Sequence, residues 1–340
     1  MTKILIVFDA VSDETFGANP FSEESKPHNS ASKIINSAEK IRDVIKSLGY
    51  SVAFYDLRGS LKNLAETVRK ENPDLVFNLA ESLGEDAMGE IRVACFFELL
   101  EIPYTGSAPY ALAAALNKGM AKEIMNAHKI PTPRHFVVKS ISEIDNLDLI
   151  PPLIVKLACE DGSIGIDERS LAKNREDIGP AVSRVLKEFG SPAIIEEFIG
   201  GKEMHVAILG NENPEVLPVA EIDFSGLPSG YPKILTYDAK WLVEHEAYRG
   251  TPVICPAKIS PALEKEIKDL SLKVYKVFEC RDYARIDFRL DESGRPFVLE
   301  VNPNPDISFG ESGFCKAAEA AGLDYPAVIK KIIDSALERI

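Results

Sequence analysis

Apolar and polar positions follow two different periods along the first hundred residues. Short, almost continuously apolar runs, typical of buried strands, lie at 4–8, 51–57 and 75–79. Between them, apolar residues recur every three or four positions, as on one face of a helix, at 31–48, 61–70 and 89–100. Strands that alternate with helices predict an open parallel sheet, which binds ligands beyond the carboxyl ends of its strands. The polar segment 9–30 is either a substrate loop at such an end or an ordinary insertion.

The pattern changes beyond residue 107. Helices are predicted at 110–116 and from Lys118 to near His128, where the sequence IPTP ends the second helix. Further strands are predicted at 136–138, 153–157, 193–199, 204–209 and 216–224, and further helices at 177–189, 261–278 and 325–339. The fold class is therefore α/β followed by α+β, in three regions at 1–106, 107–196 and 197–340.

A β-hairpin predicted at 285–302 places two acids opposite each other. Its turn, at Ser293 and Gly294, pairs residues whose numbers have a constant sum. The facing pairs are then Leu290 with Phe297, Asp287 with Glu300, and Arg285 with Asn302. The predicted apolar side of the hairpin consists of Ile286, Phe288, Leu290, Phe297, Leu299 and Val301.

The two facing carboxylates require a compensating charge. Like charges directly opposite each other destabilise a sheet by about 0.2–1 kcal/mol, and by more when they are buried. Two carboxylates and the amide oxygen of Asn302 are hard ligands that suit Mg²⁺ or Mn²⁺ shared with phosphate groups, whereas Zn²⁺ prefers His and Cys. The alternative interpretation is a hairpin face in solvent.

Two further segments have the composition of a nucleotide site, although each also fits an ordinary connection. In PPLIVKLACEDGSIGI, a strand delivers Lys156 into a loop with Gly162 and Ser163, which can surround phosphates with N–H groups and a point charge. In AIIEEFIGGKEMHVAIL, an apolar strand is followed by two glycines and Glu203. Such a segment can present backbone groups to an adenine and a carboxylate to a ribose.

Composition restricts the class of protein. A chain of 340 residues suffices for two or three domains, and its formal net charge of -14 argues against nucleic acid and acidic membranes as partners. No run reaches the length of a membrane span. The five cysteines are widely separated and odd in number, so we expect reduced core thiols in a cytoplasmic protein. The sequence leaves the choice between monomer and homodimer open.

Together, several motifs resemble the ATP-grasp superfamily, in particular its D-alanine–D-alanine ligase-like branch of carboxylate-amine ligases. They are IPYTGS with Lys118 downstream, IVKLACEDGSIG, IIEEFIGGKEMHVAIL, YDAKWL, ICPAKI and RIDFRLDESGRPFVLEVNPNPD. The resemblance implies an ATP-grasp fold with an N-terminal parallel-sheet (pre-ATP-grasp) domain. Residues 1–106 would form this substrate-side domain, 107–196 the small central lobe, and 197–340 the C-terminal lobe with the metal hairpin.

The resemblance also implies a role for each candidate residue, with ATP and two Mg²⁺ or Mn²⁺ ions as cofactors. The phosphates would be bound by Lys118, Lys156, Gly162 and Ser163. The adenine and the ribose would be bound by Glu196, Glu197, Phe198, Ile199 and Glu203. The metal ligands would be Asp287, Glu300 and Asn302, and the catalytic residues Arg285 and Lys240.

The reaction of this family joins two small molecules. A substrate carboxylate attacks the γ-phosphate of ATP and gives an acyl phosphate. An amine then displaces the phosphate to form an amide, so that ADP and phosphate are released. Loops near 162–165 and 240–241 would exclude water. Two other functions stay open from the sequence, a phosphotransferase on the same scaffold and a non-catalytic nucleotide-binding module.

The departures from the family cluster where its amino-acid substrates would bind. The family's amine-binding Glu has only candidates here, namely Glu14, Glu23 and Glu24. FNLAES replaces a His-Gly pair, Gly162-Ser163 a Ser-Ser pair, Trp241 a Tyr, Asp306 a Gly, and Glu311-Ser312 a Ser-Leu pair. An acid at Asp306 or Glu311 would repel a carboxylate. The nucleotide half is therefore expected to match the family, whereas specificity for two D-alanines is called into question.

Overall fold

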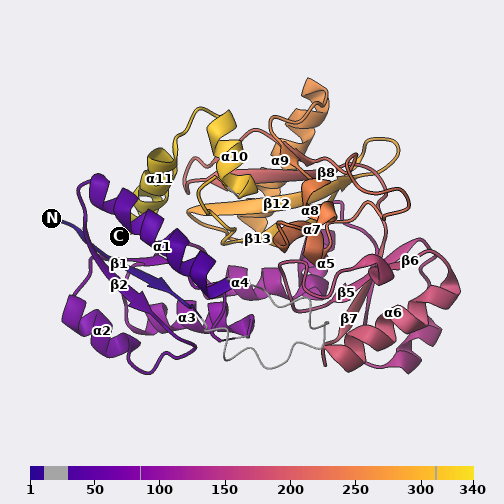
Figure 1. Ribbon diagram of the computed structural model, residues 1–340, viewed down its shortest axis with the longest axis horizontal. Coiled ribbons are helices and arrows are strands. Elements are labelled where there is room, and N and C mark those ends of the chain that lie inside the picture. Colours follow the sequence, from indigo (N-terminus) through magenta and orange to yellow (C-terminus); the bar gives the residue numbers. More distant parts are fainter. Residues whose placement is uncertain (11–29, 85, 311) are drawn as a thin grey trace.

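The computed structural model describes residues 1–10, 30–84, 86–310 and 312–340. These residues form three sheets, which Figure 1 shows as separate groups of strands. One sheet lies in each of the three regions expected from the sequence, while the limits of those regions stay a prediction. The candidates Glu14, Glu23, Glu24 and Glu311 lie outside the described residues.

The first sheet is parallel, as predicted. β1 (Lys3–Phe8) lies between β2 (Ser51–Asp56) and β3 (Leu75–Asn78). The connecting helices are α1 (Ser30–Ser47) and α2 (Leu64–Glu71), and α3 (Met88–Leu99) follows β3. Ile4 and Ile6 of β1 enter one core and Leu5 and Val7 enter another. Burial on both faces explains why this strand is apolar at every position from Ile4 to Phe8.

The second sheet follows two helices, α4 (Pro109–Leu116) and α5 (Lys118–Ala127). It is antiparallel, with the order β4 (His135–Val138), β7 (Ala193–Glu197), β5 (Leu153–Leu157) and β6 (Leu171–Ala172). The 3-10 turns Ile141–Asn146 and Glu168–Ser170 lie in its connections, and α6 (Arg175–Glu188) buries Ile178 and Val182 in the core beside the sheet.

The third sheet has the order β11 (Val253–Ile254), β10 (Ala220–Ile222), β8 (Glu203–Leu209), β12 (Tyr283–Leu290) and β13 (Pro296–Asn302). The other elements of this region are β9 (Glu215–Val216), α7 (Tyr237–Trp241), α8 (Glu246–Arg249), α9 (Pro261–Val277), α10 (Gly313–Ala320) and α11 (Tyr325–Leu337). The single strand predicted at 216–224 is wrong, because it divides into β9 and β10 around Pro218, which has no N–H to donate to a ladder. α10 was not predicted.

The hairpin of β12 and β13 confirms the two polar pairs expected from the sequence. Asp287 faces Glu300, and Arg285 faces Asn302. β8 lies on the other edge of β12, so that this hairpin is part of the sheet and not a separate ribbon.

Nearer the turn, the predicted register is wrong. Leu290 pairs with Pro296 and not with Phe297, because a β-bulge after the acidic pair shifts the register by one residue. Leu299 is the extra residue, and it lines a cleft instead of joining the apolar face. Val298 takes its place in the core.

The end of the chain returns to the first sheet. α10 and α11 bury Phe314 and Ile329 in the same core as Ile4 and Ile6 of β1. α11 also lies beside α1, as Figure 1 shows. The N-terminal sheet is thus covered on one face by helices from the C-terminal region, which holds these two regions together.

All five cysteines are free thiols. Cys280 and Cys315 are buried, as expected for core residues, but that expectation is wrong for Cys95, which is exposed on α3. No helix in the described part of the chain has the length and apolarity needed to cross a bilayer.

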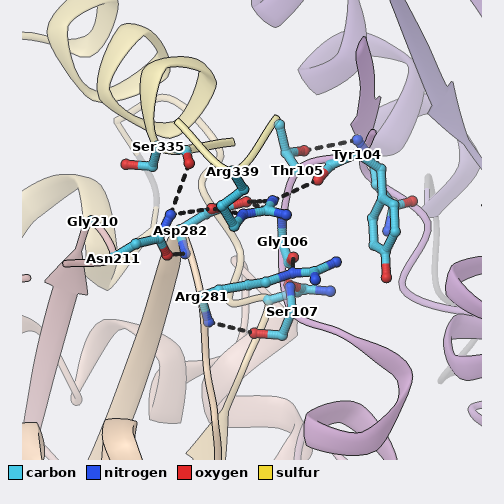
Figure 2. A network of polar contacts seen from close by, with 12 residues as sticks. Tyr104, Thr105, Gly106, Ser107, Gly210, Asn211, Arg281, Asp282, Ser335 and Arg339 are labelled. Atoms are coloured by element: carbon cyan, nitrogen blue, oxygen red, sulfur yellow. Dashed lines mark hydrogen bonds and ion pairs between the residues drawn. The ribbon is translucent and has the colours of Figure 1, made fainter. Parts of the chain in front are cut away.

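Asp282 is a fully buried acid that joins distant segments of the chain (Figure 2). Its carboxylate accepts hydrogen bonds from the Gly106 N–H (2.8 Å), the Asn211 side chain (2.9 Å) and the Arg339 guanidinium (2.6 and 3.0 Å). Asn211 also donates to the carbonyl of Ser335 (2.8 Å). Because Asp282 directly precedes β12, these bonds fix the acidic hairpin relative to the N-terminal region and the last helix.

We expect Asp282→Ala to lower the free energy of unfolding by about 3 kcal/mol, because it leaves the Arg339 guanidinium and buried donors without their acceptor. Urea denaturation followed by circular dichroism measures this change. Asp269→Ala is the control, since Asp269 forms an exposed ion pair with Lys265 whose loss changes stability by less than about 1 kcal/mol. Equal effects of the two substitutions would contradict the role of Asp282.

Candidate active site

A cleft with an empty volume of about 900 Å³ lies between the second and third sheets. Its walls come from β5 and β7 on one side and from β8, β12 and β13 on the other. Of the fourteen site residues predicted from the sequence, twelve line this cleft: Lys118, Lys156, Ser163, Glu196, Glu197, Phe198, Ile199, Glu203, Lys240, Arg285, Asp287 and Glu300. Gly162 and Asn302 do not line it but bond to residues beside it.

The facing acids of the hairpin are neutralised by cations of the chain itself. Arg285 binds Asp287 through two nitrogen atoms, at 2.7 and 2.8 Å, and Lys118 forms an ion pair with Glu300. Burial raises the pKa of Asp287, but Arg285 and His205 outweigh burial and hold this pKa well below its usual value. In the same way, Lys118 lowers the pKa of Glu300 against the effect of burial. Both acids are therefore ionised at neutral pH.

These donors fit a hard divalent cation. The two ionised carboxylates lie at paired positions on adjacent strands, and the Asn302 side-chain amide donates a hydrogen bond to Asp287 (3.0 Å). The part of the chain described here has no cluster of three or more His, Cys, Asp or Glu side chains arranged for a metal. A cation at Asp287 and Glu300 would thus need further oxygen ligands, which Mg²⁺ commonly takes from phosphates and water.

Two lysines share one carboxylate on the other wall. Glu196 on β7 lies 2.8 Å from the Lys156 ammonium and 3.4 Å from that of Lys122. Burial raises the pKa of Glu196, but the two lysines outweigh burial and lower this pKa to about 2. Burial lowers the pKa of Lys122 to about 8, although Glu196 opposes this shift. The sequence analysis missed Lys122, whose spacing of four residues from Lys118 on one helix was the available signal.

The segment after β7 is held by Arg289, a second residue that the sequence analysis missed. The Arg289 guanidinium donates to Glu203 (3.2 Å) and to the Ile199 carbonyl (2.9 Å), and it stacks over the Phe198 ring. His205 lies 3.4 Å from Glu203 and also lines the cleft. Arg289 could have been found from the strand period, since it follows Asp287 by two residues and therefore shares its face.

The two loops expected to exclude water contact each other. The Trp241 indole N–H donates to the Gly162 carbonyl (2.7 Å), and the Lys240 ammonium lies 5.2 Å from the centre of the Trp241 ring. Gly162 and Ser163 both have positive φ angles, of 60° and 62°. This tight turn brings the loop after β5 under α7, so that Trp241 covers the phosphate-loop candidate.

Acids surround the region where the first sheet faces the cleft. Although the Glu81 side chain reaches solvent, the surrounding protein and the carboxylates of Asp306 and Asp161 raise its pKa to about 8. Lys240 and Arg285 oppose this shift. The departure FNLAES, which ends in Glu81 and Ser82, was the signal for this residue in the sequence. The region favours a ligand group that carries a proton or a positive charge.

Comparisons with known proteins relate most of the chain to one family. A family model described as "D-ala D-ala ligase C-terminus" matches residues 125–334. A D-alanine–D-alanine ligase of Carboxydothermus hydrogenoformans is 34% identical over 304 residues, which are 85% of this chain and 89% of that protein. An uncharacterised protein of Sinorhizobium fredii, y4sG, is 37% identical over 268 residues, which are 78% of this chain and 75% of that protein.

The fold matches that of a solved enzyme along its whole length. The crystal structure of a D-alanine–D-alanine ligase from Bacillus anthracis, complexed with ATP, superimposes with a TM-score of 0.74. The match covers 100% of this chain and 98% of the other at 20% sequence identity. The N-terminal parallel sheet and the two lobes around the cleft thus form an ATP-grasp fold, as expected from the sequence.

We expect Trp241→Phe to loosen the loop at 160–166, because the substitution keeps an aromatic ring but removes the hydrogen bond to Gly162. A lost hydrogen bond worth about 1 kcal/mol corresponds to roughly fivefold faster amide exchange in that loop. Hydrogen–deuterium exchange with mass spectrometry measures the rates, and peptides from β1 to β3 are the internal control. Unchanged exchange at 160–166 would show that Trp241 does not hold the loop.

Proposed function

Since this chain belongs to the D-alanine–D-alanine ligase family, whose members are ATP-dependent, ADP-forming ligases, we propose that it joins the carboxylate of one amino acid to the amine of another, with D-alanine as the first candidate for both. The observation that carries the proposal is the cleft, where ionised acids and cations from two sheets meet. Family membership favours a ligase over the phosphotransferase and the non-catalytic module that the sequence left open.

In this proposal, the cleft binds ATP in an extended arrangement. Lys118 and Lys156 hold the phosphates, with Gly162 and Ser163 in the covering loop. Residues 196–199 line the adenine, and Glu203 holds the ribose, supported by Arg289 (3.2 Å). The residues that would hold two Mg²⁺ ions are Asp287, Glu300 and Asn302. When bound, Mg²⁺ neutralises negative charge on the phosphate oxygens.

The chain's own residues then support the two chemical steps. The substrate carboxylate attacks the γ-phosphorus and ADP leaves, which gives an acyl phosphate. The amine next attacks the acyl carbon, loses a proton and expels phosphate, which gives an amide. Arg285, fixed by its two bonds to Asp287, is placed to stabilise negative charge on the tetrahedral oxygen. The contact between Trp241 and Gly162 keeps water from the acyl phosphate.

D-alanine is the first candidate because full-length relatives carry the name D-alanine–D-alanine ligase. The departures at Asp306 and at 311–312 called this specificity into question from the sequence alone. An acid at Asp306 affects only one amino-acid subsite. The similarity to these relatives, in contrast, covers 85–89% of the chain, and it is the reason to test D-alanine first. A cytoplasmic location and a homodimeric state stay proposals of the same kind.

We expect the purified protein to release phosphate from MgATP only when an amino-acid carboxylate and an amine are both present. D-alanine is tested first, then other D- and L-amino acids in pairs, with phosphate measured by a coupled assay and products by mass spectrometry. L-alanine is the control for chirality. Phosphorylated acceptor without free phosphate would indicate a phosphotransferase, and no turnover with any pair would contradict the proposal.

We expect Glu300→Gln to lower turnover by at least about 100-fold while the fold is kept, because a neutral amide is a weak ligand for a divalent cation. Phosphate release measures turnover, and the melting temperature without ligand checks the fold. Glu292→Gln is the matched control, since Glu292 is exposed at the turn of the same hairpin. Full activity of Glu300→Gln would remove the metal assignment.

A further inference from the structure

Lys122 is buried without being a lining residue of the cleft. Its side chain is 1% exposed, on the inner face of α5. Its ammonium lies 3.4 Å from one oxygen of Glu196 and donates to the hydroxyl of Thr132 (3.1 Å). Thr132 in turn donates to the carbonyl of Val298 on β13 (2.8 Å). Burying a lysine is costly, so such a residue calls for an explanation beyond packing.

The charges around Glu196 do not cancel. Lys156, with 12% exposure, is paired with the second oxygen of the same carboxylate and reaches the cleft. Glu196 is itself 1% exposed. Two ammonium groups and one carboxylate leave this buried trio with one net positive charge. Without Lys122, Lys156 and Glu196 would form a neutral pair beside the cleft.

We propose that Lys122 is a positioning residue that keeps the Lys156–Glu196 pair positively charged, so that the cleft attracts the polyphosphate of a nucleotide. Lys122 acts through Glu196 and does not touch the ligand. This inference rests on the proposed nucleotide site. It extends that site to a third lysine, behind the wall that carries Lys156.

The proposal differs from a purely structural role in one measurable respect. A residue that only supports packing affects all ligands of the cleft equally. A residue that supplies net charge affects ligands in proportion to their own charge, because Coulomb energy scales with the product of the charges. Its effect is therefore present for the charged nucleotides ATP, ADP and AMP and absent for uncharged adenosine.

The test compares the binding of ATP, ADP, AMP and adenosine by isothermal titration calorimetry at pH 7, with Mg²⁺ held constant. Lys122→Met keeps most of the side-chain length and removes the charge, and it should weaken ATP binding by about 10- to 50-fold, with adenosine unchanged. Lys122→Arg should restore most of the affinity for ATP. Lys173→Met is the control, since Lys173 is an exposed lysine of the same region.

Each outcome separates this inference from the proposed function. If the unchanged protein binds no nucleotide, the nucleotide site itself is refuted. If it binds ATP but Lys122→Met weakens ATP and adenosine equally, or weakens neither, Lys122 does not supply charge. Should Lys122→Met fail to fold, Glu196→Gln is compared with Lys122→Met/Glu196→Gln, in which no buried carboxylate lacks a partner. The double variant must then bind ATP more weakly, with adenosine unaffected, for the inference to hold.

Discussion

The cleft depends on the pairing of charges that arrive from separate parts of the chain. Lys118 begins α5 and meets Glu300 of β13, while Lys156 of β5 meets Glu196 of β7. Each of these groups is largely withdrawn from water, where an unpaired charge is very unfavourable. The pairs therefore fix both walls of the cleft. They also hold the pKa values of Glu196 and Glu300 below their usual range, so that these two acids are ionised.

A second constraint fixes the position of the hairpin relative to the first region of the chain. Asp282 bonds to Gly106 from the end of the first region and to Arg339 near the end of the chain. The carbonyl of Pro303 and the side chain of Asn304, just beyond β13, bond to Ser107. The residues after the acidic hairpin are thus tied to the segment that leaves the first sheet. The hairpin that lines the cleft and the first region of the chain therefore meet at a border held by these hydrogen bonds.

Acidic and basic side chains lie on different sides of this border. Acids lie on the side of the first sheet, around Glu81 and Asp306, whereas Lys118 and Lys156 line the cleft. Arg285 stands between them, held by Asp287. An acyl phosphate formed here would have a cation beside its oxygens and a polar region from which an amine can approach.

The sequence alone determined the parallel first sheet, the acidic pair of Asp287 and Glu300 and most residues of the cleft. The sheet and the acidic pair follow from local rules, since strand and helix periods and a turn decide which side chains share a face. Most residues of the cleft were instead predicted from the resemblance of several motifs to the ATP-grasp family. The hairpin register predicted from the sequence is wrong beyond Asp287, because a bulge depends on how Val298 packs in the core.

Only the tertiary structure decided which charges meet. Local signals place Arg289 on the face of Asp287 and Lys122 on the helix of Lys118, but they do not give the partners that define what these residues do. Asp282 is a further case, since its partners lie 176 residues before it and 57 residues after it. Pairing over such distances follows from how the sheets pack, and the period of a single segment does not contain that information.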